Sequence, residues 1–234
     1  MRFARALLAS FSYFSVLPGR TYETVPDKDA IAMLPVVGLV IGTIAGAAAA
    51  GVLDLSAFWQ GPAVLVAWVL CIALSGAIHI DGFLDCCDGL FAMEKPERRL
   101  EIMRDPHHGT YAIVGMAVLS FAWVGAIGLI GPTLWYPALL AFTGAASRAF
   151  AAVAARAPVW PALVAIVPML LFFRRYELWK PAVALAVAAV VALTIGVFAW
   201  RRLGGKLNGD CYGAIVVVSE VTLLYALGLL KQFR

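Results

Sequence analysis

Long apolar runs separated by short polar segments make up most of this chain. Residues 31–52 contain no charged side chain and are long enough to cross a bilayer as a helix. A 15-residue run at 159–173 is too short for a regular span and predicts a short, kinked or re-entrant segment. The other runs that predict spans are 62–80, 111–131, 136–155, 181–199 and 213–230. We therefore expect an all-α, polytopic membrane bundle of about seven transmembrane helices, with six to eight as the range.

The N-terminal segment 1–18 resembles a signal peptide, because Arg2 and Arg5 precede an apolar stretch. No small-x-small cleavage site follows, and the chain continues with Pro18 and Arg20. We therefore expect a retained helix that lies in the membrane interface.

The composition supports a membrane protein. Of the 234 residues, 63% are hydrophobic and 14% are charged, whereas soluble domains are about 45–50% apolar and about 25% charged. So few charges exclude an ordinary soluble domain, a disordered chain and a nucleic-acid-binding protein. The length fits one membrane-embedded domain over residues 1–234, and the lipid bilayer is its expected surrounding. The sequence leaves open whether the chain works alone or as a homo-oligomer.

The basic residues suggest how the bundle is oriented. Two connections are rich in lysine and arginine, and the positive-inside rule places both in the cytoplasm. The basic residues are Lys95, Arg98, Arg99 and Arg104 in one connection and Arg201, Arg202 and Lys206 in the other. A third basic group, Arg174, Arg175 and Lys180, would then lie outside and disagrees with this orientation.

The acidic residues are concentrated: seven of the fourteen lie between residues 81 and 105. Asp81, Asp85 and Asp88 are spaced i, i+4, i+7, which places three carboxylates on one face of a helix. Like charges so close repel each other unless a cation neutralises them. Hard oxygen ligands favour Mg²⁺ or Mn²⁺. The alternative is a solvated helix face just outside the bilayer.

Other polar residues near the cluster are candidates for catalysis or phosphate binding. Glu101 and Asp105 could extend the metal site, and His79 could orient a carboxylate or act as a base. His107 and His108 are candidates in an exposed loop. Guanidinium groups bind phosphate oxygens well, although these arginines could equally belong to a cytoplasmic surface helix: Arg98, Arg99 and Arg104.

Two further features point to an anionic substrate. The segment 201–213 is rich in glycine, and backbone N–H groups of such a loop can surround an anion. Its candidate residues are Gly204, Gly205, Lys206, Gly209 and Asp210. Arg148, after Ser147, lies inside an apolar span and requires an anion, either an acidic side chain or a phosphate. Together the residues predict phosphoryl transfer at a membrane surface.

At this point the motifs resemble those of the cobalamin synthase (adenosylcobinamide-GDP ribazoletransferase) family. The resemblance rests on H-x-D-G-x-x-D-x-x-D-G at residues 79–89 and E-I-M-R-D-x-x-x-G-T at 101–110. It extends to S-x-F-S-V-L-P at 12–18, to the span start at 33–42 and to the Ser147-Arg148 pair. The late Gly-Gly to Gly-Asp loop, 204–210, also matches.

The resemblance implies a reaction and a location. The 3′-hydroxyl of α-ribazole, or of its 5′-phosphate, would attack adenosylcobinamide-GDP and release GMP. The product would be adenosylcobalamin or its 5′-phosphate, late in cobalamin biosynthesis. Such an enzyme is Mg²⁺-dependent and lies in the prokaryotic cell (inner) membrane with a cytoplasmic active face. By position, the metal ligands would be Asp81, Asp85 and Asp88.

Two alternatives stay open at this stage. A CDP-alcohol phosphotransferase also uses a cluster of acids at the membrane surface, but its D-G-x-x-A-R run is not matched at residues 83–87. A divalent-cation transporter could use the aspartates as an ion path. The acids here gather at one span-to-loop junction, however, and no repeat typical of transporters is visible.

Overall fold

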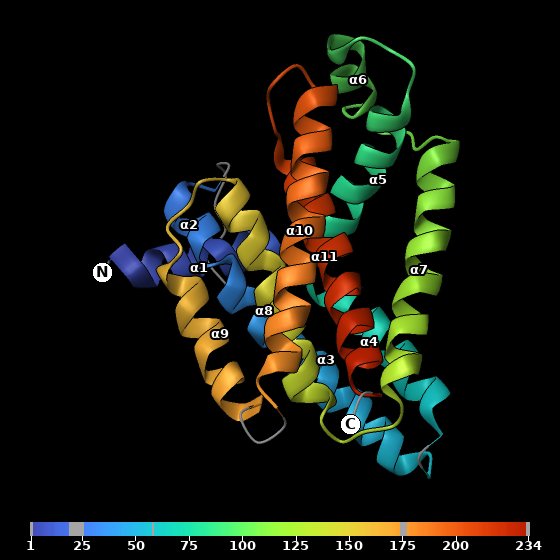
Figure 1. Cartoon of the computed structure of the whole chain (residues 1–234). Coiled ribbons are helices and arrows are strands. Elements are labelled where there is room, and N and C mark those ends of the chain that lie inside the picture. Colours follow the sequence, from blue (N-terminus) through green and yellow to red (C-terminus); the bar gives the residue numbers. More distant parts are fainter. Residues whose placement is uncertain (1, 19–25, 58, 174–176, 233–234) are drawn as a thin grey trace.

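The computed structural model describes residues 2–18, 26–57, 59–173 and 177–232, and within them it is all-helical (Figure 1). The helices up to residue 91 are α1 (Arg2–Phe14), α2 (Lys28–Ala32), α3 (Leu34–Leu55), α4 (Gln60–Leu74) and α5 (Ile78–Phe91). Those that follow are α6 (Pro96–Ile102), α7 (Thr110–Ile130), α8 (Tyr136–Ala154), α9 (Trp160–Phe173), α10 (Trp179–Arg202) and α11 (Gly209–Leu230). The predicted fold class, a polytopic helical membrane bundle, is confirmed.

Five of the described helices are long and apolar enough to cross a membrane: α3, α7, α8, α10 and α11. The bent pair α4 and α5 would count as a sixth. Five or six spans among the described helices are fewer than the seven predicted. Only the count of six falls within the predicted range of six to eight. The reason is length, because α4 has 15 residues and α9 has 14. The short helix α9 agrees with the short segment expected at 159–173.

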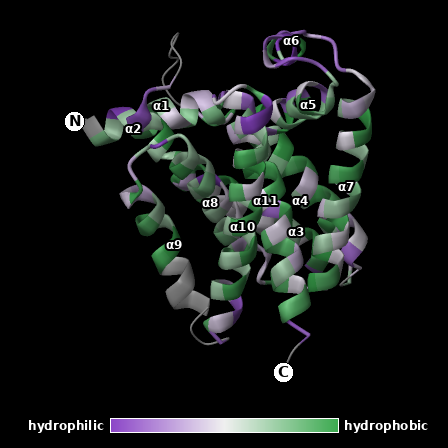
Figure 2. Ribbon diagram, turned by 45° about the horizontal axis from the view of Figure 1, so that its top comes forward, coloured by the Kyte–Doolittle hydropathy of each residue, from purple (hydrophilic) through white to green (hydrophobic). Residues whose placement is uncertain are grey.

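The predicted span 62–80 is wrong in its last six residues, because the chain turns sharply after Leu74. Helix α4 ends at Leu74, and α5 begins at Ile78 at an angle of 88° to it. Gly76 and Ala77 both have positive φ, +60° and +58°, which an α-helix cannot accommodate. Helix α5 therefore does not continue in the direction of α4 and instead lies across the end of the bundle (Figure 2).

One end of the bundle carries most of the hydrophilic colour (Figure 2). Helices α1, α2 and α5 lie across this end, and α6 projects beyond α5. The position of α1, which exposes Phe3 and Leu8, fits the interfacial helix expected from the sequence. The loop between α10 and α11 reaches the same end, so the two basic connections lie together as predicted. Lys180, at the opposite end, forms an ion pair with Glu177; Arg174 and Arg175 lie outside the described residues.

The tightest packing is between α3 and α8. Gly38, Gly42 and Gly46 repeat every fourth residue on α3, and a methyl group on any of them would collide with the backbone of α8. Small residues allow such close approach of helices in a membrane. Alanines also allow close packing of helices, since Ala45 and Ala184 are fully buried. The role in close packing predicted for the alanine-rich stretches is thus confirmed at these positions.

The outer helices show what surrounds the bundle. Helix α7 exposes Val118 and Phe121, and α10 exposes Val190 and Leu193, each by more than 60% of its surface. Such continuous apolar exposure is stable only against lipid. The chain is therefore a multi-pass membrane protein.

Candidate active site

Two helices bring carboxylates together at the hydrophilic end of the bundle. Asp81 and Asp85 lie on α5, and Asp210 lies in the first turn of α11. The helices touch there because Gly82 packs directly on the backbone of Asp210, where a Cβ would come within 2.8 Å of its Cα. Asn208 caps α11 by accepting the Cys211 N–H at 3.1 Å and donates to the Asp210 carboxylate at 2.7 Å. We call Asp81, Asp85 and Asp210 the carboxylate cluster.

The members of the carboxylate cluster differ in their exposure to solvent. The Asp81 side chain is 66% exposed, whereas that of Asp85 is 16% exposed. Burial and the negative charges of Asp210 and Asp81 raise the pKa of Asp85 to about 6. An anionic cluster of this kind is stabilised by a bound cation or proton.

His108 lies close to two members of the carboxylate cluster, Asp81 and Asp85. Its Nε2 lies 3.8 Å from an Asp81 oxygen, and its Nδ1 lies 3.8 Å from an Asp85 oxygen. The neighbouring His107 points elsewhere: its backbone N–H and Nδ1 lie 2.9 and 2.8 Å from Asp105. The backbone N–H bond from His107 is the main reason why the pKa of Asp105 is lowered.

Asp88 has a different environment from the two other aspartates of α5. Its carboxylate accepts the backbone N–H of Gly109 at 2.6 Å and that of Ala112 at 3.0 Å. These are free N–H groups at the start of α7, so Asp88 caps that helix from a distance along the chain. Of the three predicted metal ligands, Asp88 therefore has both oxygens already engaged.

Within the described part of the chain, no three His, Cys, Asp or Glu side chains lie close enough together to hold a metal ion. The assignment of Asp81, Asp85 and Asp88 as ligands thus stays a prediction. The donor chemistry nevertheless suits a hard divalent cation, because carboxylates from two helices accumulate negative charge at one place. Asp210 fits such a set better than Asp88, since its charge acts on Asp85 more strongly and both oxygens of Asp88 are engaged at the start of α7.

The predicted phosphate-binding arginines are not equivalent. Arg98 is exposed and pairs with Glu101 at 2.7 Å. Arg99 is buried and donates to the carbonyl of Arg202 at 2.9 Å, which fixes α6 to the end of α10. Arg104 is exposed, and its charge acts on the Asp210 carboxylate. Arg98 and Arg104 are therefore the two available to an anion.

The glycine-rich loop lies beside α6. Gly204 and Gly205 both have positive φ, +67° and +87°, a conformation that glycine adopts without strain. Gly204 packs near Pro96, and Lys206 is exposed. Gly209 begins α11 and leads directly into Asp210. The structure thus places this predicted loop next to the carboxylate cluster.

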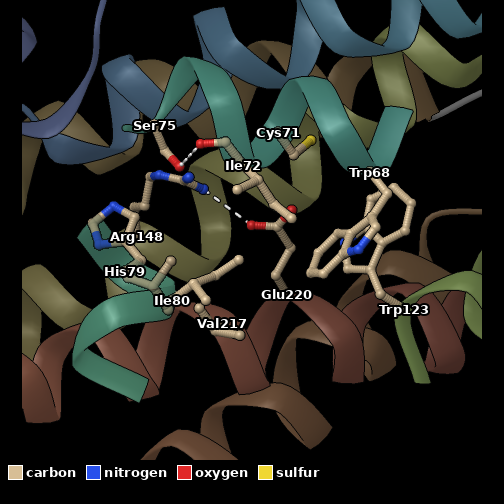
Figure 3. A pocket seen from close by; sticks show the side chains of 11 residues that line it. Trp68, Cys71, Ile72, Ser75, His79, Ile80, Trp123, Arg148, Val217 and Glu220 are labelled. Atoms are coloured by element: carbon tan, nitrogen blue, oxygen red, sulfur yellow. Dashed lines mark hydrogen bonds and ion pairs between the residues drawn. The ribbon is translucent and has the colours of Figure 1, made fainter. Parts of the chain in front are cut away.

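Arg148 lies inside the bundle and has an acidic partner there (Figure 3). Its Nη1 donates to Glu220 on α11 at 3.0 Å and to the carbonyl of Gly144 at 3.1 Å, and the Arg148 and Glu220 side chains are only 5% and 11% exposed. Ser147 also donates to Glu220, at 3.4 Å. Of the two anions expected for Arg148, the structure supplies the carboxylate.

His79 lines this interior pocket, where it lies close to Arg148 (Figure 3). It is buried, stacks on Phe14 at 6.0 Å, and its Nε2 has no hydrogen-bond partner among the described residues. The pocket also contains Arg148 and Glu220 and has a volume of about 30 Å³. A cavity of this size can hold a water molecule.

A larger cavity of about 430 Å³ opens beside the carboxylate cluster. Asp81 and Asp210 form part of its wall, and Tyr13, Phe14 and Tyr212 contribute aromatic rings. A pocket that combines apolar walls with a few polar groups is typical of a small-molecule site. This end of the bundle is therefore the candidate active site.

Sequence reasoning missed two parts of this site. It left His108 as a loop candidate, although the spacing in R-D-P-H-H-G-T holds it over Asp81 and Asp85. It also missed the aromatic wall from α1 and α11, because no pattern along the chain links residues so far apart. Glu220 was visible as an isolated acid in an apolar run and could have been paired with Arg148 by that signal.

Comparison with known proteins identifies the family of this chain. The profile of the family described as cobalamin-5-phosphate synthase matches residues 6–228. The adenosylcobinamide-GDP ribazoletransferase of Deinococcus radiodurans is 30% identical over 94% of this chain and 84% of its own length. The protein of the same name from Klebsiella pneumoniae is 31% identical over 95% of this chain and 99% of its own. None of the solved structures matches. The chain belongs to the cobalamin-5-phosphate synthase family.

Proposed function

We propose that this protein transfers the cobinamide-bearing phosphoryl group of adenosylcobinamide-GDP to α-ribazole or α-ribazole 5′-phosphate, with release of GMP. The relatives named for this activity support the reaction. The observation that carries the proposal is structural: carboxylates of α5 and α11 meet at the wall of a cavity large enough for a small substrate. The family match gives no support to a CDP-alcohol phosphotransferase or a cation transporter.

Mg²⁺ is the proposed cofactor, and its proposed ligands are Asp81, Asp85 and Asp210. These side chains would have to approach one another more closely than they lie here to share the ion. When bound, the ion would neutralise charge on the pyrophosphate of the substrate. Arg98 and Arg104, which are both exposed, would bind the remaining phosphate oxygens. The charge of Arg104 acts on Asp210 in the carboxylate cluster. Asp88 would fix the start of α7, and with it the loop that carries His108.

In the transfer, the 3′-hydroxyl oxygen of the acceptor forms a bond to the phosphorus that carries cobinamide. The bond between this phosphorus and the oxygen of GMP breaks, and GMP leaves. The hydroxyl proton must be removed, and imidazole is the side chain most often used as a general base. His108 is the proposed base, because its ring nitrogens lie 3.8 Å from both Asp81 and Asp85.

We also propose that the active end faces the cytoplasm of a prokaryotic cell, in its inner membrane. The two basic connections lie at that end, as the positive-inside rule requires.

The deciding experiment supplies purified protein in nanodiscs with adenosylcobinamide-GDP, α-ribazole and Mg²⁺, and measures GMP and the corrinoid product by chromatography. We expect both products in equal amounts, and neither when Mg²⁺ is chelated. Absence of product from the wild-type protein with either form of the acceptor would refute the proposed reaction.

A further inference from the structure

The cavity of about 430 Å³ beside the carboxylate cluster has a chemistry that selects among ligands. Its wall is built by α1, α2, α3, α5, α8 and α11. Among the described residues that line it, the charged side chains are Asp81 and Asp210, and the remainder is mostly apolar or aromatic. Such a wall favours a flat, largely apolar ligand that presents a hydroxyl group to the carboxylates.

The aromatic side of the cavity is held in place by its neighbours. The end of α1 is tied to the end of α4 by a hydrogen bond from the Val16 N–H to the Leu74 carbonyl, 2.9 Å long. Tyr13 contacts Phe14 edge-on at 4.9 Å, and Phe14 stacks on His79 at 6.0 Å with 20° between the ring planes. The rings are therefore positioned before a ligand binds, which reduces the entropy lost on binding.

The size of the cavity distinguishes the two proposed substrates. Small-molecule pockets range from roughly 300 to 1,000 Å³, so this cavity is at the lower end. It suits a nucleoside, whereas a corrin macrocycle with its nucleotide diphosphate is too large to be enclosed.

We infer that this cavity is an acceptor pocket: it binds the heteroaromatic base of the acceptor nucleoside between Tyr13, Phe14 and Tyr212, and directs the ribose hydroxyl toward Asp81 and Asp210. The inference rests on the proposed function and specifies where one of its two substrates binds. The corrinoid substrate then approaches from outside the pocket, on the side of α6.

The test compares two partly exposed tyrosines that each contact a phenylalanine ring. Tyr13 is 40% exposed, lines the pocket and contacts Phe14, whereas Tyr111 is 56% exposed, lies on α7 and stacks on Phe91 at 6.1 Å. We expect Tyr13→Ala to raise the KM for α-ribazole and for its 5′-phosphate about tenfold, and to leave the KM for adenosylcobinamide-GDP unchanged. Tyr111→Ala should change neither KM.

A second measurement does not depend on turnover. Equilibrium dialysis of radiolabelled α-ribazole against the full-length protein in nanodiscs should show about tenfold weaker binding for Tyr13→Ala. The same loss is expected for Tyr212→Ala, which removes the ring contributed by α11. Tyr111→Ala should bind like the wild type. If Tyr13→Ala is too unstable to purify, Tyr212→Ala decides alone.

The outcomes separate this inference from the proposed function. Turnover by the wild type with equal acceptor KM and equal binding in the Tyr13, Tyr212 and Tyr111 variants would overturn the acceptor pocket and leave the reaction intact. Equal increases in the KM of both substrates would also overturn it, because that result would mean a general structural defect. Binding of α-ribazole without any turnover would support the pocket and refute the reaction.

Discussion

Two groups of charged side chains in this protein are built in opposite ways. Arg148 and Glu220 lie inside the bundle, carry opposite charges and satisfy each other at 3.0 Å. The carboxylate cluster lies at the hydrophilic end and consists of like charges. The charges of Asp210 and Asp81 raise the pKa of Asp85, and the cluster contains no positive charge that would balance them. A buried charge without a partner is costly, so the interior pair must be complete within the chain. An excess of one charge at a pocket, by contrast, can be retained for a ligand.

This difference separates structure from chemistry among residues that look alike in the sequence. Asp88 has the same helical spacing as Asp81 and Asp85, yet its oxygens cap α7. Arg99 lies beside Arg98, yet its guanidinium fixes α6 to α10. Residues whose contacts hold two helices together should therefore affect stability when changed, and residues that face the candidate site should affect activity.

The largest expected effect comes from the carboxylate cluster. Asp85→Ala should lower kcat about 1,000-fold, equivalent to about 4 kcal/mol of activation free energy, because it removes the carboxylate on which the charges of both Asp210 and Asp81 act. The unfolding midpoint in detergent should stay close to that of the wild type. The assay is release of GMP under saturating substrates. Full activity of Asp85→Ala would contradict the assignment of the carboxylate cluster to the active site, since Asp85 would then have no chemical role.

The interior pair should respond in stability. Glu220→Ala leaves the Arg148 charge buried without a partner and should lower the free energy of unfolding by about 3–5 kcal/mol. The double variant Arg148→Met with Glu220→Leu should recover most of this loss, because both charges are then removed. Unfolding in SDS, followed by circular dichroism, measures both. A double variant that is stable but inactive would assign the pair to the active site and contradict the distinction drawn here.

The two adjacent histidines provide a matched pair. His108→Ala should lower kcat about 100-fold, within the range that general acid–base catalysis contributes, because the ring stands 3.8 Å from Asp81 and Asp85. His107→Ala should keep nearly full activity, since His107 contacts the exposed Asp105. Equal losses in both variants would indicate that the loop, and not the His108 ring, is what matters.

The pH dependence of stability should identify Asp85 in metal-free protein. The pKa of an aspartate is about 3.9 in an unfolded chain, whereas the pKa of Asp85 in the folded protein is raised to about 6. Between these values the unfolded state binds fewer protons, so the free energy of unfolding should fall as the pH rises from about 4 to 6. Asp85→Asn should flatten this slope.

Asp105→Asn is the control for this measurement. The pKa of Asp105 is lowered, so its contribution to stability is lost only below about pH 4 and lies outside the window. Because Mg²⁺ binds ionised carboxylates, adding it should reverse the slope. An unchanged slope in Asp85→Asn would show that the raised pKa belongs to another group.

The smallest effect is expected at Arg98. Its ion pair with Glu101 is 62% exposed on both sides, and such pairs contribute about 0.2–1 kcal/mol. Arg98→Ala should therefore leave the unfolding midpoint nearly unchanged while raising the KM for adenosylcobinamide-GDP severalfold. Glu101→Ala should cause the same small change in stability without the change in KM. A rise in KM in both variants would mean that the pair acts as one unit in placing α6.

Much of the fold could be predicted from the chain alone, because membrane spans depend on local composition. The spans at 31–52, 136–155 and 213–230 correspond to α3, α8 and α11. The bend between α4 and α5 could not be predicted, because Gly76 and Ala77 carry no strong signal within an apolar run. Composition indicates that a segment is buried in lipid, but not whether its helix continues straight.

The site was predictable in its parts and not in its assembly. Helical spacing identified Asp81 and Asp85, and the glycine loop pointed to Asp210. That Asp210 meets the α5 carboxylates depends on contact between Gly82 and α11, which is a tertiary property. Asp88 shows the opposite limit, because its role as a cap depends on where α7 begins.

The glycine face of α3 has a consequence for how the protein is made. The glycines of this face pack against the backbone of α8. Helices α4 to α7 lie between α3 and α8 in the chain. Since a chain is synthesised from its N-terminus, α3 enters the membrane well before its partner exists. The glycine face of α3 therefore stays unpacked in the bilayer during synthesis of α4 to α7. The core is completed only when α8 has been inserted.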